Sequence, residues 1–100
     1  MTTITGSQIA TAIDTNIRTY GWPYSAWYCG IAADPNDRLI NGHNADGRNN
    51  AARYWDAGSD AIARSIEQHF IAKGCKGGDG GGDHRTRYVY VYKISLTTRE

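Results

Sequence analysis

An alternating stretch near the end of the chain is the feature that most restricts its fold. Residues 87–96 read RYVYVYKISL. Successive side chains of a β-strand point to opposite faces of a sheet, so this stretch predicts a strand with three tyrosines on one face and two valines on the other. The tyrosines are Tyr88, Tyr90 and Tyr92, and the valines are Val89 and Val91.

A second strand is predicted over residues 26–32, which are rich in aromatic and β-branched residues. Two strands alone make a sheet of marginal stability. Either a third strand therefore lies in the first few residues or around Tyr54 and Trp55, or helices cover a very small sheet. The predicted fold class is α+β, with helices packed on a small antiparallel sheet.

Two long helices are predicted from apolar residues that recur on one face. The first covers residues 7–20. The other begins after Ser59 or Asp60, either of which can cap a helix, and it ends at Gly74. The apolar stripes are Ile9, Ile13 and Ile17 in the first helix, and Ile62, Ile66 and Phe70 in the other.

A short helix and a long loop are predicted in the middle of the chain. Asp34 suits a helix cap and Pro35 suits the first turn, so a helix opens there and ends by Gly42. Residues 43–55 are polar and carry Asn, Asp and Gly, which predicts a loop.

Length and charge limit the classes of function. One hundred residues predict a single domain, residues 1–100. A net charge of +1 gives no whole-molecule attraction to nucleic acid, so any phosphate-binding surface must be a local patch. Cys29 and Cys75 have no zinc-site spacing, and neither a signal peptide nor an apolar run of membrane length is found. We expect a cytoplasmic protein with reduced thiols and no membrane contact.

Residues 28–43 read YCGIAADPNDRLINGH, and this block resembles the second half of a GIY-YIG nuclease domain. In that family a strand with Tyr-x-Gly runs into Asp-Pro, then Arg-Leu, then a His. The downstream helix ARSIEQHFIAKG, residues 63–74, carries Glu67 where the family has a metal-binding Glu. The resemblance covers residues 26–74, about half of the chain.

The resemblance implies metal-dependent hydrolysis of a phosphodiester. It places Tyr28 near the attacking water, Arg38 on the phosphate, His43 as a proton-handling or positioning group, and Glu67 on Mg²⁺ or Mn²⁺. These residue types suit the chemistry, because guanidinium groups match phosphate oxygens and Mg²⁺ needs few protein carboxylates. A Tyr hydroxyl can orient or deprotonate water if a cation or metal lowers its pKa. We expect Tyr28, Arg38, Glu67 and one C-terminal tyrosine to face a shared cleft.

Three features depart from the family pattern. The first motif, Gly-Ile-Tyr, is not found about ten residues before Tyr28. A strand's place in a sheet does not depend on chain order, so the C-terminal strand can fill that position in a circular rearrangement, with Tyr90 as the missing tyrosine. His43 follows Arg38 at one residue more than the spacing common in the family. The family often has an Asn after the helix that carries the Glu, and this chain has no Asn after Asn50.

A glycine-rich stretch, residues 74–85, reads GCKGGDGGGDHR. It lacks the order of a phosphate-binding P-loop and follows a helix, not a strand. It is either a flexible linker or a loop whose neighbouring cations contact nucleic-acid phosphates without reading bases. Those cations are Lys76, His84, Arg85 and Arg87.

The leading expectation is a small GIY-YIG-like endonuclease domain that hydrolyses DNA, or RNA, with DNA ahead of RNA. An alternative on the same scaffold is a catalytically inactive binding or inhibitor protein, of the sort that mobile elements encode, acting through protein or nucleic-acid contacts. The missing motif, the absent Asn and the near-neutral charge favour this alternative. A third interpretation is an interaction module whose aromatic residues, Trp22 and Tyr24 among them, bind protein or stack bases.

Overall fold

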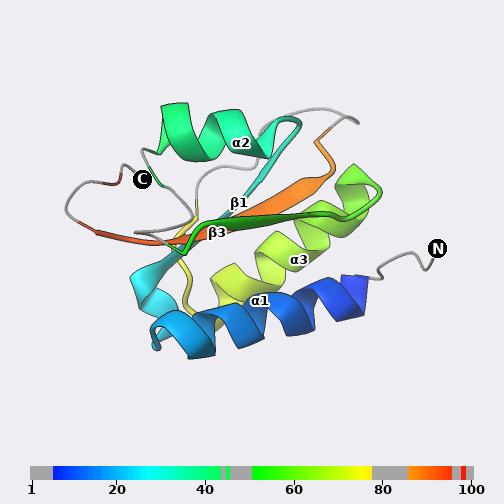
Figure 1. Ribbon diagram of the computed structural model, residues 1–100. Coiled ribbons are helices and arrows are strands. Elements are labelled where there is room, and N and C mark those ends of the chain that lie inside the picture. Colours follow the sequence, from blue (N-terminus) through cyan, green and yellow to red (C-terminus); the bar gives the residue numbers. More distant parts are fainter. Residues whose placement is uncertain (1–5, 44, 46–50, 78–85, 96–97, 99–100) are drawn as a thin grey trace.

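A three-stranded antiparallel sheet forms the centre of the fold, with α2 on one face and α1 and α3 on the other (Figure 1). The computed structural model describes residues 6–43, 45, 51–77, 86–95 and 98. The elements are α1 (Gly6–Tyr20), η1 (Tyr24–Ala26), β1 (Trp27–Ala32), α2 (Pro35–Asp37), η2 (Arg38–Gly42), β2 (Arg53–Asp56), α3 (Asp60–Lys73) and β3 (Tyr88–Lys93). The predicted α+β class with a small antiparallel sheet is confirmed.

The last strand of the chain, β3, is the central strand of the sheet. It pairs antiparallel with β1, which places Tyr90 opposite Gly30. It also pairs antiparallel with β2, which places Tyr54 opposite the same tyrosine. The third strand therefore lies around Tyr54 and Trp55, one of the two places predicted, inside a stretch that was otherwise predicted as a loop.

The alternation predicted for β3 is confirmed by the two cores that it separates. Val89 and Val91 belong to the core shared with α1 and α3. Tyr90 and Tyr92 belong to a second cluster on the opposite face, toward α2. Each face of this one strand therefore packs against a different layer, because side chains alternate along it.

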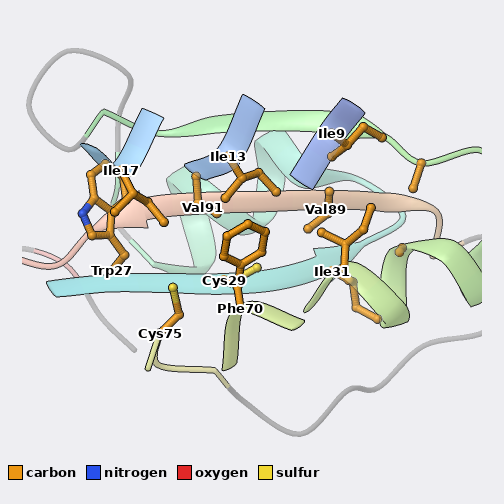
Figure 2. Packing of buried hydrophobic residues seen from close by; sticks show 13 residues of the cluster. Ile9, Ile13, Ile17, Trp27, Cys29, Ile31, Phe70, Cys75, Val89 and Val91 are labelled. Atoms are coloured by element: carbon orange, nitrogen blue, oxygen red, sulfur yellow. The ribbon is translucent and has the colours of Figure 1, made fainter. Parts of the chain in front are cut away.

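The larger core lies between the sheet and the two long helices. Figure 2 shows the isoleucines of α1 pointing toward the valines of β3 and toward Phe70 of α3. Ile9, Ile13 and Ile17 are fully buried, as their spacing predicted. Each such side chain contributes about 1.5–3 kcal/mol when it leaves water, so this layer is a main source of stability.

The buried stripe of α3 differs from the predicted one. Ile62 is 41% exposed, whereas Ala63, Ile66, Glu67 and Phe70 are buried. In the first turn of α3 the buried position is therefore Ala63 and not the preceding Ile62, so the buried stripe is rotated relative to the predicted one. The carboxylate of Glu67 therefore lies within the buried stripe, next to Ile66.

Capping residues fix where α2 and α3 begin. The Asp34 carboxylate accepts a hydrogen bond of 3.1 Å from the backbone N–H of Asp37, and Pro35 occupies the first turn. This helix continues as the π-helical turn η2 and ends at Gly42, as predicted. The Ser59 hydroxyl accepts from the backbone N–H of Ile62 at 3.2 Å and begins α3.

The first residues after α3 continue the sheet. The backbone N–H of Lys76 donates to the carbonyl of Trp27 at 2.8 Å, and the carbonyl of Lys76 accepts from the backbone N–H of Cys29 at 2.9 Å. Gly77 has no room for a side chain, because a Cβ there would lie 2.4 Å from Ile71 Cδ1. This part of the glycine-rich stretch is therefore bound to the outer edge of β1 and is not a flexible linker, while residues 78–85 lie outside the described residues.

Both cysteines are free and buried. Burial raises the pKa of Cys75 to about 11. Burial also raises the pKa of Cys29, and the charge of Cys75 is a second, smaller cause of the same rise. In the described part of the chain, none of the helices has the length and apolar character needed to cross a membrane.

Candidate functional site

The candidate site is a cluster of one histidine and three tyrosines between the sheet and α2. His43 follows η2, and both of its ring nitrogens reach tyrosine hydroxyls of β3. Nε2 lies 2.8 Å from the Tyr90 hydroxyl, and Nδ1 lies 3.1 Å from the Tyr92 hydroxyl. We refer to Tyr28, His43, Tyr90 and Tyr92 as the tyrosine–histidine cluster.

The fourth member of the cluster, Tyr28, comes from β1; its ring stacks on that of Tyr92 and is tilted against that of His43. Its ring centroid lies 4.7 Å from that of His43 and 5.2 Å from that of Tyr92. Gly30, two residues along the same strand, lies beneath the Tyr90 side chain. A Cβ at Gly30 would lie 2.4 Å from the Tyr90 hydroxyl, so only glycine leaves space for that ring.

Arg38 connects the cluster to the surface. This exposed residue of η2 acts on the Tyr90 hydroxyl, because its guanidinium opposes the rise in pKa that burial causes there. The same hydroxyl shares a hydrogen bond with Nε2 of His43. A neutral imidazole donates from one ring nitrogen and accepts at the other, so His43 donates to one of the two tyrosine hydroxyls and accepts from the other. These two hydrogen bonds join Tyr90, His43 and Tyr92 into one buried chain.

The protonation of Tyr90 limits its chemistry. Burial raises the pKa of its hydroxyl to about 12, helped by the neighbouring phenol of Tyr28, and Arg38 acts in the opposite direction. The net effect of this environment is opposite to the lowered pKa that a tyrosine base requires. Tyr90 is therefore a protonated hydrogen-bonding group at neutral pH and positions His43.

The cluster is closed to solvent. The exposed fractions of its side chains run from 0% for Tyr92 to 7% for Tyr28. The hydroxyls of Tyr90 and Tyr92 and the ring of His43 are therefore not available to a ligand at the surface, whereas the guanidinium of Arg38 is exposed. A guanidinium is the group in this part of the molecule that can bind an anion.

Glu67 lies in the other layer of the molecule. It is 3% exposed and belongs to α3, which packs against the face of β1 that carries Cys29. Burial raises the pKa of Glu67, and the charge of Arg64 acts against that rise. Because Cys29 and Gly30 point to opposite faces of β1, the sheet lies between Glu67 and the cluster. The structure does not bring Glu67 to Arg38, contrary to the expected shared cleft.

Glu67 does not fit the Mg²⁺ or Mn²⁺ that the resemblance assigns to it. Mg²⁺ binds one or two carboxylates together with water and substrate phosphates, so its carboxylate must be open and close to the phosphate-binding cation. Glu67 is buried and distant from the face of Arg38. Among the residues that the structure describes, no three His, Cys, Asp or Glu side chains form a group that could hold a metal ion.

The cations predicted as one patch are separated. Lys76 lies beside Tyr28, near the end of the sheet where β1 begins. Arg87 lies at the opposite end of the sheet, where it forms an ion pair of 3.0 Å with Asp56. Proximity in sequence therefore did not bring these two cations together in the structure. His84 and Arg85 lie outside the described residues.

Tyr92 is a member of the cluster that the sequence did not single out. The hydroxyl of Tyr92 is the second partner of His43. The alternation of β3 contained the signal, because Tyr92 shares a face with Tyr90, but the choice between Tyr88 and Tyr92 depends on where His43 lies. Tyr88 instead contacts Tyr54, with ring centroids 6.1 Å apart.

Comparisons with protein-family models, with curated proteins and with solved structures gave no match for this chain. The candidate site is therefore interpreted from its own geometry.

Proposed function

We propose that this chain binds nucleic acid through the phosphodiester backbone, on a GIY-YIG-like scaffold without catalytic activity. The observation that carries the proposal is the exposed Arg38 beside a closed cluster, where its guanidinium acts on the Tyr90 hydroxyl. The antiparallel pairing that places Tyr90 opposite Gly30 supports a circularly rearranged scaffold. The burial of the cluster hydroxyls and the location of Glu67 favour binding over hydrolysis.

The chemistry of the surface supports a phosphate ligand. The guanidinium of Arg38 is permanently charged and matches phosphate oxygens. Lys76 is exposed on the outer edge of β1, beside Tyr28, and adds a second cation. Two cations that contact the backbone give affinity without sequence preference, so DNA and RNA both fit the proposal, with DNA the first substrate to test.

Binding can be tested by fluorescence anisotropy with a labelled DNA duplex over a range of salt concentrations. We expect Arg38→Ala to weaken binding and to lower the slope of log Kd against log salt by about 0.9, the value for one phosphate contact. Arg53→Ala, which removes an exposed arginine of β2, is the matched control and should leave the slope unchanged. Wild-type protein without salt-dependent binding would refute the proposal and favour a protein partner.

Hydrolysis of the phosphodiester is the second candidate. It is favoured by the convergence of Tyr28, His43, Tyr90 and Arg38, the residues to which the resemblance assigns catalytic roles. Supercoiled plasmid incubated with Mg²⁺ or Mn²⁺ tests it. Nicking by wild type that is lost in both Arg38→Ala and Glu67→Gln would establish the nuclease and overturn the inactive scaffold. An inert wild type that still binds DNA supports binding alone.

A further inference from the structure

A second surface, at the junction of α1 and β1, carries aromatic rings and cations. Trp22 is 55% exposed and Tyr20 is 49% exposed, although large aromatic side chains are usually covered. Both lie where α1 ends and the chain turns toward β1 (Figure 1). We refer to the surface formed by Tyr20, Trp22, Arg18, Lys73 and Lys93 as the tryptophan corner.

Trp22 is held in place from one side. The edge of its ring meets Tyr24, with centroids 4.7 Å apart, and the Arg18 guanidinium lies 4.8 Å from its centroid. Asp14 anchors both neighbours, since it accepts hydrogen bonds from Tyr24 and from Arg18. The hydrogen bond from Tyr24 lowers the pKa of Asp14, so this anchor stays ionised at neutral pH. The ring is thus fixed before any ligand arrives.

The tryptophan corner contains three cations from three elements. Arg18 comes from α1, and its charge is offset by Asp14 at 2.9 Å. Lys73, the last residue of α3, lies 5.5 Å from the centroid of Tyr24. Lys93, the last residue of β3, donates to the carbonyl of Tyr20 at 3.2 Å. The corner is therefore positive around an exposed aromatic surface.

We propose that the tryptophan corner binds single-stranded nucleic acid, with an unpaired base stacked on Trp22 and flanking phosphates on Lys73 and Lys93. A fixed aromatic ring beside cations is the combination that single strands need, since every base has a face that stacks and each linkage carries a negative charge. In a duplex the bases are already stacked on one another. The inference extends the proposed function to a second site and rests on residues other than Arg38.

The test uses a labelled oligo(dT) of about 12 nucleotides, within the range that single-strand surfaces cover, and a chelator to prevent hydrolysis. We expect Trp22→Ala to weaken binding roughly tenfold and Trp22→Phe to retain most of the affinity. Tyr54→Ala removes a comparably exposed ring at the other edge of the sheet and should have little effect. Circular dichroism establishes that each variant is folded.

The charge contribution is measured from salt dependence. Lys73→Ala and Lys93→Ala should each lower the slope of log Kd against log salt by about 0.7, the value for a single-strand phosphate contact. Arg53→Ala is the matched control. Trp22→Ala should not change this slope, because stacking releases no counterions.

The outcomes separate this inference from the proposed function. Oligonucleotide binding that is unchanged in folded Trp22→Ala overturns the inference, and a loss only in Arg38→Ala leaves the proposed function standing. The reverse pattern supports the corner and refutes the role of Arg38. Equal dependence of duplex binding on Trp22 contradicts the preference for single strands. Self-association lost in Trp22→Ala, without oligonucleotide binding, overturns the inference in favour of a second copy of the chain.

Discussion

At the scale of single residues, the difference in burial between His43 and Arg38 decides what each can contact. His43 is a buried imidazole whose two nitrogens both meet tyrosine hydroxyls, so it is satisfied without water. Arg38 is exposed, and its guanidinium acts on the buried hydroxyl of Tyr90. A surface cation that is already partly ordered loses less conformational freedom when it binds an anion.

The hydroxyl of Tyr90 provides the prediction at this scale. Tyr90→Phe leaves Nε2 of buried His43 without its partner, so we expect the free energy of unfolding to fall by about 1–3 kcal/mol. Urea denaturation measures this change. Tyr54→Phe removes an exposed hydroxyl from the paired position of β2 and should change stability by less than about 0.5 kcal/mol. Equal losses in the two variants would mean that the hydrogen bond contributes nothing specific.

At the scale of elements, the pairing of β1 with β3 positions the cluster. The register places Gly30 opposite Tyr90 and Tyr28 opposite Tyr92, so the rings of one strand pack over the backbone and rings of the other. Cross-strand aromatic pairs of this kind stabilise a sheet and fix its register. The outer edge of β1 is in turn covered at Tyr28 by Lys76.

Adding one methyl group tests this arrangement. Gly30→Ala places a Cβ 2.4 Å from the hydroxyl oxygen and 2.5 Å from Cζ of Tyr90, so we expect a loss of about 1–3 kcal/mol from overpacking. The same change made in a Tyr90→Ala background should cost much less, because the ring is absent. Thermal or urea unfolding of the four proteins gives the coupling energy. A cost that is the same in both backgrounds would place the strain elsewhere.

For the whole molecule, the sheet separates two different interiors. The side toward α1 and α3 is almost wholly apolar and also contains Glu67. The side toward α2 is aromatic and hydrogen-bonded. A carboxylate within the apolar layer gives global stability a dependence on pH, since folding changes its proton affinity.

The sign of that dependence is fixed by the direction of the shift. Burial raises the pKa of Glu67 in the folded state above its ordinary value of 4.5, so the folded state binds the proton more tightly. Stability from this group is complete below about pH 4.5 and is lost as pH rises through the folded pKa. Glu67→Gln should be more stable than wild type at neutral pH, with the difference shrinking toward acid.

Denaturation series across pH measure this difference. Gln68→Glu, which adds an exposed carboxylate on the same helix, is the control and should introduce no comparable slope. A difference between wild type and Glu67→Gln that stays constant with pH would contradict the buried, proton-linked carboxylate.

Local pattern determined the two long helices, the start of α2 and the strands β1 and β3 of this protein, whereas β2 lies in a stretch predicted as a loop. The spacing of Ile9, Ile13 and Ile17 predicted α1, the alternation of β3 predicted two separate faces, and Asp34 and Ser59 predicted helix starts that their hydrogen bonds confirm. These features depend on the geometry of one helix or one strand, which neighbouring residues specify. The α+β class followed from their order.

Only the tertiary structure decided which residues meet. Tyr28, His43, Tyr90 and Tyr92 converge because the last strand lies at the centre of the sheet. Glu67 is separated from them because α3 covers the other face. The face of the sheet on which a side chain lies depends on its odd or even position along the strand and on the layer that each helix joins. The spacing of a sequence motif specifies neither. That is why the sequence could name a guanidinium, a carboxylate and phenols for one site, while the packing of the sheet placed the carboxylate in the other layer.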